Sequence, residues 1–233
     1  MKPLSDRTAG FTDSVIRRMT RISNQYGAVN LSQGFPDFDP PKAILDRLAE
    51  VAHEDYHQYS ITWGAQNFRE ALAKTYSVTG WRLGYVIAPA PIIERAKKVH
   101  DFLTVGAAAP LQEAIIPGLR FGQDYYDDLL AKYTHKRDLF CKGLDALGLV
   151  HNVPQGAYYV MMDISEFGYD SDLKFCEDLA AKVGVGAVPG SSFFRELVNH
   201  LIRFHFAKKD ETLHDALNRL EALRSKIPAK AAR

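Results

Sequence analysis

The sequence predicts an α/β protein whose C-terminal part is an α+β unit, with helices on one side of a sheet. The final third alternates two strand-like runs, 157–164 and 201–207, with helical patterns over 171–183 and from Asp210 onward. Upstream, helical spacing predominates, and one short apolar run that ends at Pro89 is typical of a buried strand. The 233 residues are enough for one or two domains with a hydrophobic core.

The first predicted element is a packed helix over 11–25, because apolar residues recur there at helical spacing. These residues are Phe11, Val15, Met19 and Ile22. The run 27–41 is dense in Gly, Pro and Asp, which predicts an extended, loop-like segment. Pro41 then suits a helix start, and a helix of about three turns follows. Its apolar stripe contains Ile44, Leu45, Leu48, Val51 and Ala52.

Further elements follow in the middle of the chain. A short helix is predicted over 68–74, and the strand that ends at Pro89 lies within 79–90. Two helices are then expected over 92–102 and 125–147. Small residues separate these helices, and a hinge is predicted at Phe121-Gly-Gln-Asp124, before the second one.

The terminal helix and the preceding strand complete the predicted C-terminal unit. Asp210 is placed to cap the helix N-terminus. An apolar stripe follows it, formed by Leu213, Leu217, Leu220, Leu223 and Ile227. In the strand, alternation puts Ile202, Phe204 and Phe206 on the core face and Leu201, Arg203 and His205 on the other face.

Composition favours a small-molecule partner. Lys plus Arg, 29 in number, nearly balance Asp plus Glu, 28, so no broad basic field is available for nucleic acid or an acidic membrane. Only Cys141 and Cys176 are present, which argues against a disulfide framework or a thiolate metal site and favours the cytoplasm. No apolar stretch approaches the length that a membrane span requires.

The segment from Lys74 to Tyr85 carries the strongest chemical pattern. It places Arg82, between two glycines, eight residues after Lys74. This segment resembles the signature of class I/II, fold-type I, pyridoxal-phosphate-dependent aminotransferases, and of their aspartate/kynurenine group in particular. The resemblance implies that Lys74 bonds to the cofactor aldehyde and shuttles the α-proton, while Arg82 binds the cofactor phosphate. A surface lysine that ends the helix 68–74 is the alternative for Lys74.

Three further positions are assigned by the same resemblance. The segment 31–41 is similar to the one whose glycine approaches the substrate carboxylate, which implies this role for Gly34; a turn glycine is the alternative. The segment 57–73 resembles the stretch whose tyrosine reaches the cofactor phosphate across a homodimer interface, which implies this role for Tyr59. The alternative is that Tyr59 only packs against neighbouring residues. Arg203 corresponds to the arginine that binds the substrate α-carboxylate, with a solvated sheet position as the alternative.

The resemblance runs in two blocks, 28–73 and 74–213, and the family has a long segment between them that this sequence lacks. The resemblance implies an N-terminal segment over 1–40, a reduced large cofactor-binding domain over 41–120 and a small domain over 121–233. No position matches the aspartate that pairs with the cofactor ring nitrogen, so slow amino-group transfer between an α-amino acid and a 2-oxo acid is expected. A non-catalytic remnant or interaction module is the second hypothesis.

A competing motif lies at His53-Glu-Asp-Tyr-His57, which fits the HExxH pattern of zinc hydrolases. That pattern needs a helix for both imidazoles to share a face, and the helical spacing fades near Ala52. The extended motif requires glycine and histidine where Ser60 and Trp63 stand. The aminotransferase hypothesis therefore ranks first, with no metal site expected.

Overall fold

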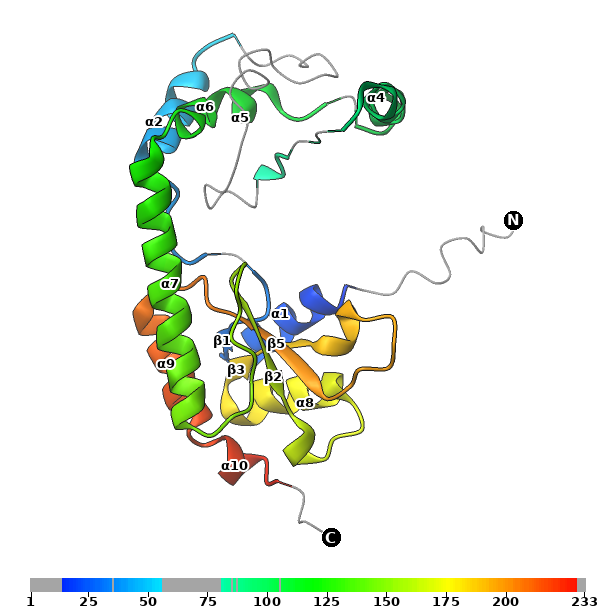
Figure 1. Ribbon diagram of the computed structural model, residues 1–233, viewed down its shortest axis with the longest axis vertical. Coiled ribbons are helices and arrows are strands. Elements are labelled where there is room, and N and C mark those ends of the chain that lie inside the picture. The colour runs from blue at the N-terminus through cyan, green and yellow to red at the C-terminus, as the bar shows by residue number, and fades with distance from the viewer. Residues whose placement is uncertain are drawn as a thin grey trace, which may run out of the picture. The chain divides into compact units, whose positions relative to one another are not determined.

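The computed structural model describes residues 14–34, 36–55, 81–84, 86, 88–104 and 106–229 (Figure 1). The chain separates into two compact units, one of residues 1–37 and 130–233 and the other of residues 38–129. Within the described ranges, no helix is long and apolar enough to cross a membrane. The predicted mixture of helices with a small sheet is confirmed.

The first unit contains two small sheets. Its antiparallel sheet has the strand order β2-β5-β4, with β2 at Tyr159–Asp163, β5 at Leu201–His205 and β4 at Val188–Pro189. A parallel pair joins β1 (Val29–Asn30) to β3 (Val185–Gly186). Short helical turns complete this part: η3 (Ser165–Phe167), η4 (Leu179–Val183) and η5 (Gly190–Phe193). The strands predicted over 157–164 and 201–207 are both confirmed.

Helices surround these strands, and most were predicted. They are α1 (Val15–Gln25), α8 (Asp172–Asp178), α9 (Asp210–Leu220) and α10 (Leu223–Lys226). The long helix α7 (Gln123–Ala146) belongs to both units, since its residues up to 129 are part of the second unit and those from 130 are part of the first. Its final turns run beside α9, where Gly143 meets the Leu217 side chain (Figure 1). The predicted α9–α10 stripe is confirmed, since four of its residues are buried and Leu217 packs against the core.

The core lies against one face of β5, as predicted. Ile202, Phe204 and Phe206 are all buried, and Phe204 meets Phe140 of α7 edge to face with ring centroids 5.8 Å apart. His205, on the opposite face as alternation predicts, is nevertheless fully buried as well. His205 is covered because its backbone N–H donates to the Leu31 carbonyl at 3.1 Å, which brings the 29–34 segment over the end of the strand.

The predicted cap of α9 is also wrong. Lys209 is the N-cap residue, and the Asp210 carboxylate instead accepts from Lys136 and His135, each at 2.8 Å. Asp37 takes the capping role, since its carboxylate accepts from the Lys209 N–H at 2.6 Å and the Thr212 hydroxyl at 2.7 Å. A capping side chain distant in sequence gives no local signal, which explains the error.

The second unit contains α2 (Lys42–Val51), α4 (Ala90–Thr104), α5 (Ala109–Ala114) and α6 (Ile116–Leu119). The predictions of α2, α4 and α7 are confirmed, although Leu45 in the α2 stripe is 38% exposed. Helices α5 and α6 were not predicted. Both are short and have a proline at their first or second position.

The strand predicted before Pro89 is absent from the described residues 81–84, 86, 88 and 89, and the Val86 side chain is 73% exposed. A buried strand needs hydrogen-bonding neighbours on its backbone. All strands in the described part of the chain belong to the other unit, so this apolar run has none there. The helix predicted over 68–74 lies outside the described residues.

Gly190 is the glycine whose replacement should disturb this fold most clearly. A Cβ atom there would lie 2.5 Å from the Leu201 carbonyl oxygen and 2.9 Å from the Leu201 Cβ. We expect Gly190→Ala to lower the free energy of unfolding by about 1–3 kcal/mol, because the backbone of β5 must shift. Gly156→Ala is the control, since nothing lies within 4 Å of its added Cβ. Equal denaturation midpoints for the two variants would contradict this packing.

Candidate carboxylate-binding site

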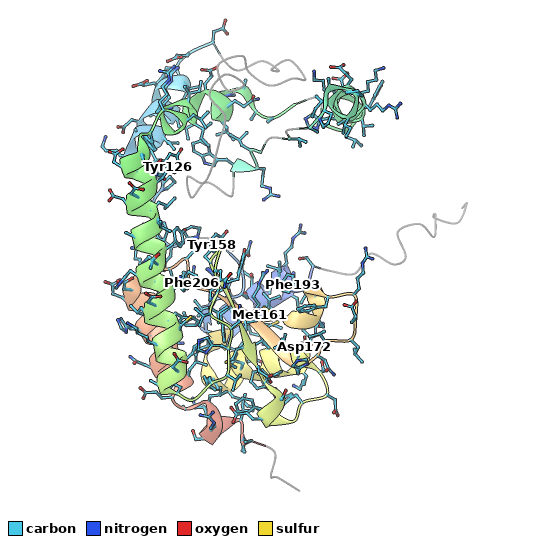
Figure 2. The ribbon with its side chains drawn as sticks, viewed as in Figure 1. Tyr126, Tyr158, Met161, Asp172, Phe193 and Phe206 are labelled. Atoms are coloured by element: carbon cyan, nitrogen blue, oxygen red, sulfur yellow. The ribbon has the colours of Figure 1, made fainter. Side chains whose placement is uncertain are left out.

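Arg203 occupies the middle of the central strand β5, directly opposite Met161 on β2 and Val188 on β4. Its guanidinium carbon lies 4.1 Å from the ring centroid of Tyr159 and 3.9 Å from that of Phe193. Tyr159 shares the sheet face of Arg203, whereas Phe193, labelled in Figure 2, comes from the turn η5. Two aromatic rings therefore hold the charged group, an arrangement that we call the aromatic clamp.

No carboxylate among the described residues neutralises the charge of Arg203, and its assigned contacts are the two rings. Partial burial lowers the pKa of Arg203, but a guanidinium stays protonated in proteins. The N–H donors of a guanidinium lie in its plane, and an aromatic contact to its face leaves them available to an anion. A carboxylate fits this fork with two hydrogen bonds.

Gly34 lies next to the same clamp. A Cβ atom at Gly34 would lie 2.5 Å from the Tyr159 hydroxyl oxygen and 3.3 Å from a ring carbon of Tyr158. The close approach requires a residue without a side chain. The structure thus brings the sequence-predicted Gly34 and Arg203 to the same tyrosine, Tyr159.

Local hydrogen bonds hold the Gly34 segment in place. The Asn30 side-chain oxygen accepts from the Ser32 N–H at 3.0 Å and the Ser32 hydroxyl at 2.5 Å. Upstream, β1 pairs with β3 in parallel, and Leu31 bonds to His205 of β5. The loop-like character predicted for 27–41 is therefore correct, with β1 as a short ordered part of it.

A further tyrosine lies behind the clamp. Tyr158 packs against Tyr159 with centroids 4.7 Å apart and stacks on Tyr133 of α7 at 5.9 Å (Figure 2). Burial, assisted by the Tyr159 hydroxyl, raises the pKa of Tyr158 to about 12. The Tyr158 hydroxyl therefore stays protonated at neutral pH and can serve as a hydrogen-bond donor.

The remaining predicted site residues belong to the sequence range of the second unit. Arg82 falls in the described segment 81–84 of the second unit, and the residue is exposed. Its φ of 56° is in the left-handed region, which a residue other than glycine adopts at a cost that is often met at functional sites. Lys74 and Tyr59 lie outside the described residues.

The competing zinc motif lacks the required helix over its described residues 53–55. Helix α2 ends at Val51, and His53 is exposed beyond it. The Glu54 carboxylate is bound by both terminal nitrogens of Arg47, at 2.5 and 2.9 Å, which lowers the pKa of Glu54. His57 lies outside the described residues, and the described ones contain no cluster that could hold a metal ion.

Comparison with known proteins decides the family. The family model of aminotransferase class I and II matches residues 71–220, which include Arg82, the clamp residues Tyr159 and Phe193, and Arg203. The chain belongs to the class I and II aminotransferase family. Proteins of this family depend on pyridoxal phosphate.

Two relatives illustrate the match. A methionine aminotransferase of Escherichia coli is 38% identical over 154 residues, which cover 66% of this chain and 40% of that protein. An aspartate aminotransferase of Pyrococcus horikoshii is 33% identical over 175 residues, covering 72% of this chain and 44% of that protein. The chain therefore spans less than half the length of these relatives.

Solved structures agree on the fold of the chain. A methionine aminotransferase structure from Escherichia coli has a TM-score of 0.85 at 22% identity, with coverage of 95% of this chain and 99% of that chain. An N-succinyldiaminopimelate aminotransferase structure from Mycobacterium tuberculosis has a TM-score of 0.87 at 18% identity, covering 95% and 100%. These structural alignments span nearly all of the compared chains, whereas the sequence alignments cover much less. The chain has the fold-type I architecture and is short relative to its relatives.

Proposed function

We propose that this protein transfers an amino group between an α-amino acid and a 2-oxo acid with bound pyridoxal phosphate, and that Arg203 binds the α-carboxylate of both. The observation that carries the proposal is a guanidinium without a described carboxylate partner, held between Tyr159 and Phe193 beside Gly34. Both substrates carry a carboxylate next to the reacting carbon. One fixed arginine therefore orients either of them.

The proposal assigns the cofactor to Lys74, Arg82 and Tyr59. Arg82 has suitable chemistry, since its guanidinium can bind a phosphate bidentately and its strained backbone fits a functional position. Lys74 would bond to the aldehyde and carry the α-proton, while Tyr59 would reach the phosphate from the second copy of a cytoplasmic homodimer. When bound, the cofactor supplies an electron sink for the carbanion. Slow transfer is expected because no residue matches the ring-nitrogen aspartate.

A second candidate is a carboxylate-binding protein without transferase activity. The short span relative to the relatives favours it, because most of a relative's length has no counterpart in the sequence match. Under this alternative, Arg203 still binds carboxylates, but cofactor binding does not saturate and no amino group moves. Substrate binding and cofactor binding must therefore be measured separately.

Adding pyridoxal phosphate tests the cofactor assignment. We expect the absorption band of a lysine-bound cofactor in the parent protein, with saturation at one cofactor per chain. Lys74→Ala should lose this band because no amine is left at the cofactor aldehyde. Lys98→Ala, at an exposed position of α4, is the matched control and should keep it. An unchanged band in Lys74→Ala would make the assignment of Lys74 wrong.

A further inference from the structure

Asp172 is a buried carboxylate in the first unit, only 3% exposed, at the first residue of α8 (Figure 2). One of its oxygens accepts from the Ser191 N–H at 2.7 Å. The other accepts from the Ser191 hydroxyl at 2.9 Å and from the Leu173 N–H at 2.8 Å. No lysine, arginine or histidine pairs with Asp172 within the described ranges.

This arrangement has an energetic meaning. A buried carboxylate is costly, and here only neutral donors offset the cost. Two of the three donors belong to a single residue, Ser191, which is 19 positions away in the sequence. The carboxylate thus fixes the start of the turn η5 against the start of α8.

The turn fixed by Asp172 carries one ring of the aromatic clamp. Phe193 is the last residue of η5, two positions after Ser191. The other end of the turn is also constrained, since Gly190 packs against the Leu201 backbone, two residues before Arg203. Phe193 itself is 43% exposed, so burial alone does not hold its ring at 3.9 Å from the Arg203 guanidinium.

We propose that Asp172 is a positioning residue for the carboxylate site: through Ser191 it sets the place of Phe193 over Arg203, and so the orientation in which Arg203 meets a carboxylate. This inference rests on the proposed role of Arg203. Asp172 does not touch the ligand. Its effect passes through Phe193, which makes the proposal testable by coupling between the two residues.

The test compares Asp172→Asn, Phe193→Leu and the double variant, with 3-phenylpropionate as the carboxylate probe and 3-phenylpropionamide as its neutral analogue. Binding is measured by calorimetry on the full chain. We expect each single change to weaken carboxylate binding about 5- to 10-fold, in line with the loss of one cation–π contact. The double variant should bind the carboxylate with the same affinity as the single variant that binds it less tightly. A loss of affinity in the double variant equal to the product of the two single losses would overturn the proposal.

Two further variants keep the test decisive. Ser191→Ala removes only the hydroxyl bond to Asp172, so we expect a smaller loss of about 2- to 3-fold. If Asp172→Asn does not fold, the same cycle is run with Ser191→Ala and Phe193→Leu. Arg203→Gln separates the two proposals. If Arg203→Gln binds the carboxylate as well as the parent does, the proposed role of Arg203 is wrong; if only Arg203→Gln weakens binding, the positioning role of Asp172 is wrong.

Discussion

Replacing Arg203 with glutamine is expected to weaken the binding of a 2-oxo acid by about 100-fold, equivalent to about 3 kcal/mol. Glutamine cannot supply the charge or the two parallel N–H donors that a carboxylate accepts. The affinity of Arg203→Lys should lie between those of the parent and Arg203→Gln. Lysine keeps the charge but loses the planar fork and the stacking on Tyr159 and Phe193. Calorimetric titration with a 2-oxo acid measures all three affinities.

The control for this prediction removes the same charge from a neighbouring position. Arg195 is exposed in the segment that follows η5, and Arg195→Gln should change the affinity less than 2-fold, since an exposed charge is screened. The amide analogue of the acid should bind weakly to every variant. Equal losses in Arg203→Gln and Arg195→Gln would show a general charge effect and would contradict a specific site.

Acid should unfold this protein through His205. Burial, together with the nearby Lys208, lowers the pKa of His205 from 6.5 to about 3. Arg203 also disfavours the charged imidazole, while Asp37 and the Asn30 backbone favour it only partly. The unfolded chain therefore takes up a proton near pH 6.5 that the folded chain takes up only near pH 3. Stability is full above pH 6.5 and falls as the pH drops through this window, by up to about 1.4 kcal/mol per pH unit.

The cumulative loss between pH 6.5 and pH 3 is roughly 4 to 5 kcal/mol, a large share of the stability of a typical domain. His205→Leu should remove this part of the pH dependence. At neutral pH the variant should stay folded, because neither ring nitrogen makes a hydrogen bond of normal geometry within the described structure. His214→Leu, at an exposed position of α9, is the control. Urea unfolding at several pH values measures the slopes, and identical slopes in His205→Leu and the parent would contradict the account.

Much of the fold could be predicted because its signals are local. The periodicity in α7, α9 and β5 reflects one-sided burial, and Ile202 and Phe204 are buried as alternation requires. The errors arise where contacts between segments far apart in the sequence determine the local structure. The run before Pro89 has strand composition but no described strand partner, and Asp37, far away in sequence, replaces Asp210 as the cap of α9.

The site was predictable only in part. Gly34 and Arg203 were singled out by resemblance, and the structure places both against Tyr159. Tyr159, Phe193 and Asp172 were missed. Alternation along β2 and β5 could have suggested Tyr159, since the two strands are neighbours and antiparallel. Phe193 and Asp172 depend on hydrogen bonds between a turn and a helix start, for which the sequence contains no local pattern.

The proposed function requires that Lys74 and Arg203 act together in moving an amino group between two carboxylic acids. Transfer of ¹⁵N from a labelled α-amino acid to a 2-oxo acid, followed by mass spectrometry in the presence of pyridoxal phosphate, tests it most directly. We predict slow transfer by the parent and a loss of at least about 100-fold in both Lys74→Ala and Arg203→Gln. Absence of transfer by a parent protein that binds the 2-oxo acid, or equal transfer by the parent and Lys74→Ala, would contradict the claim.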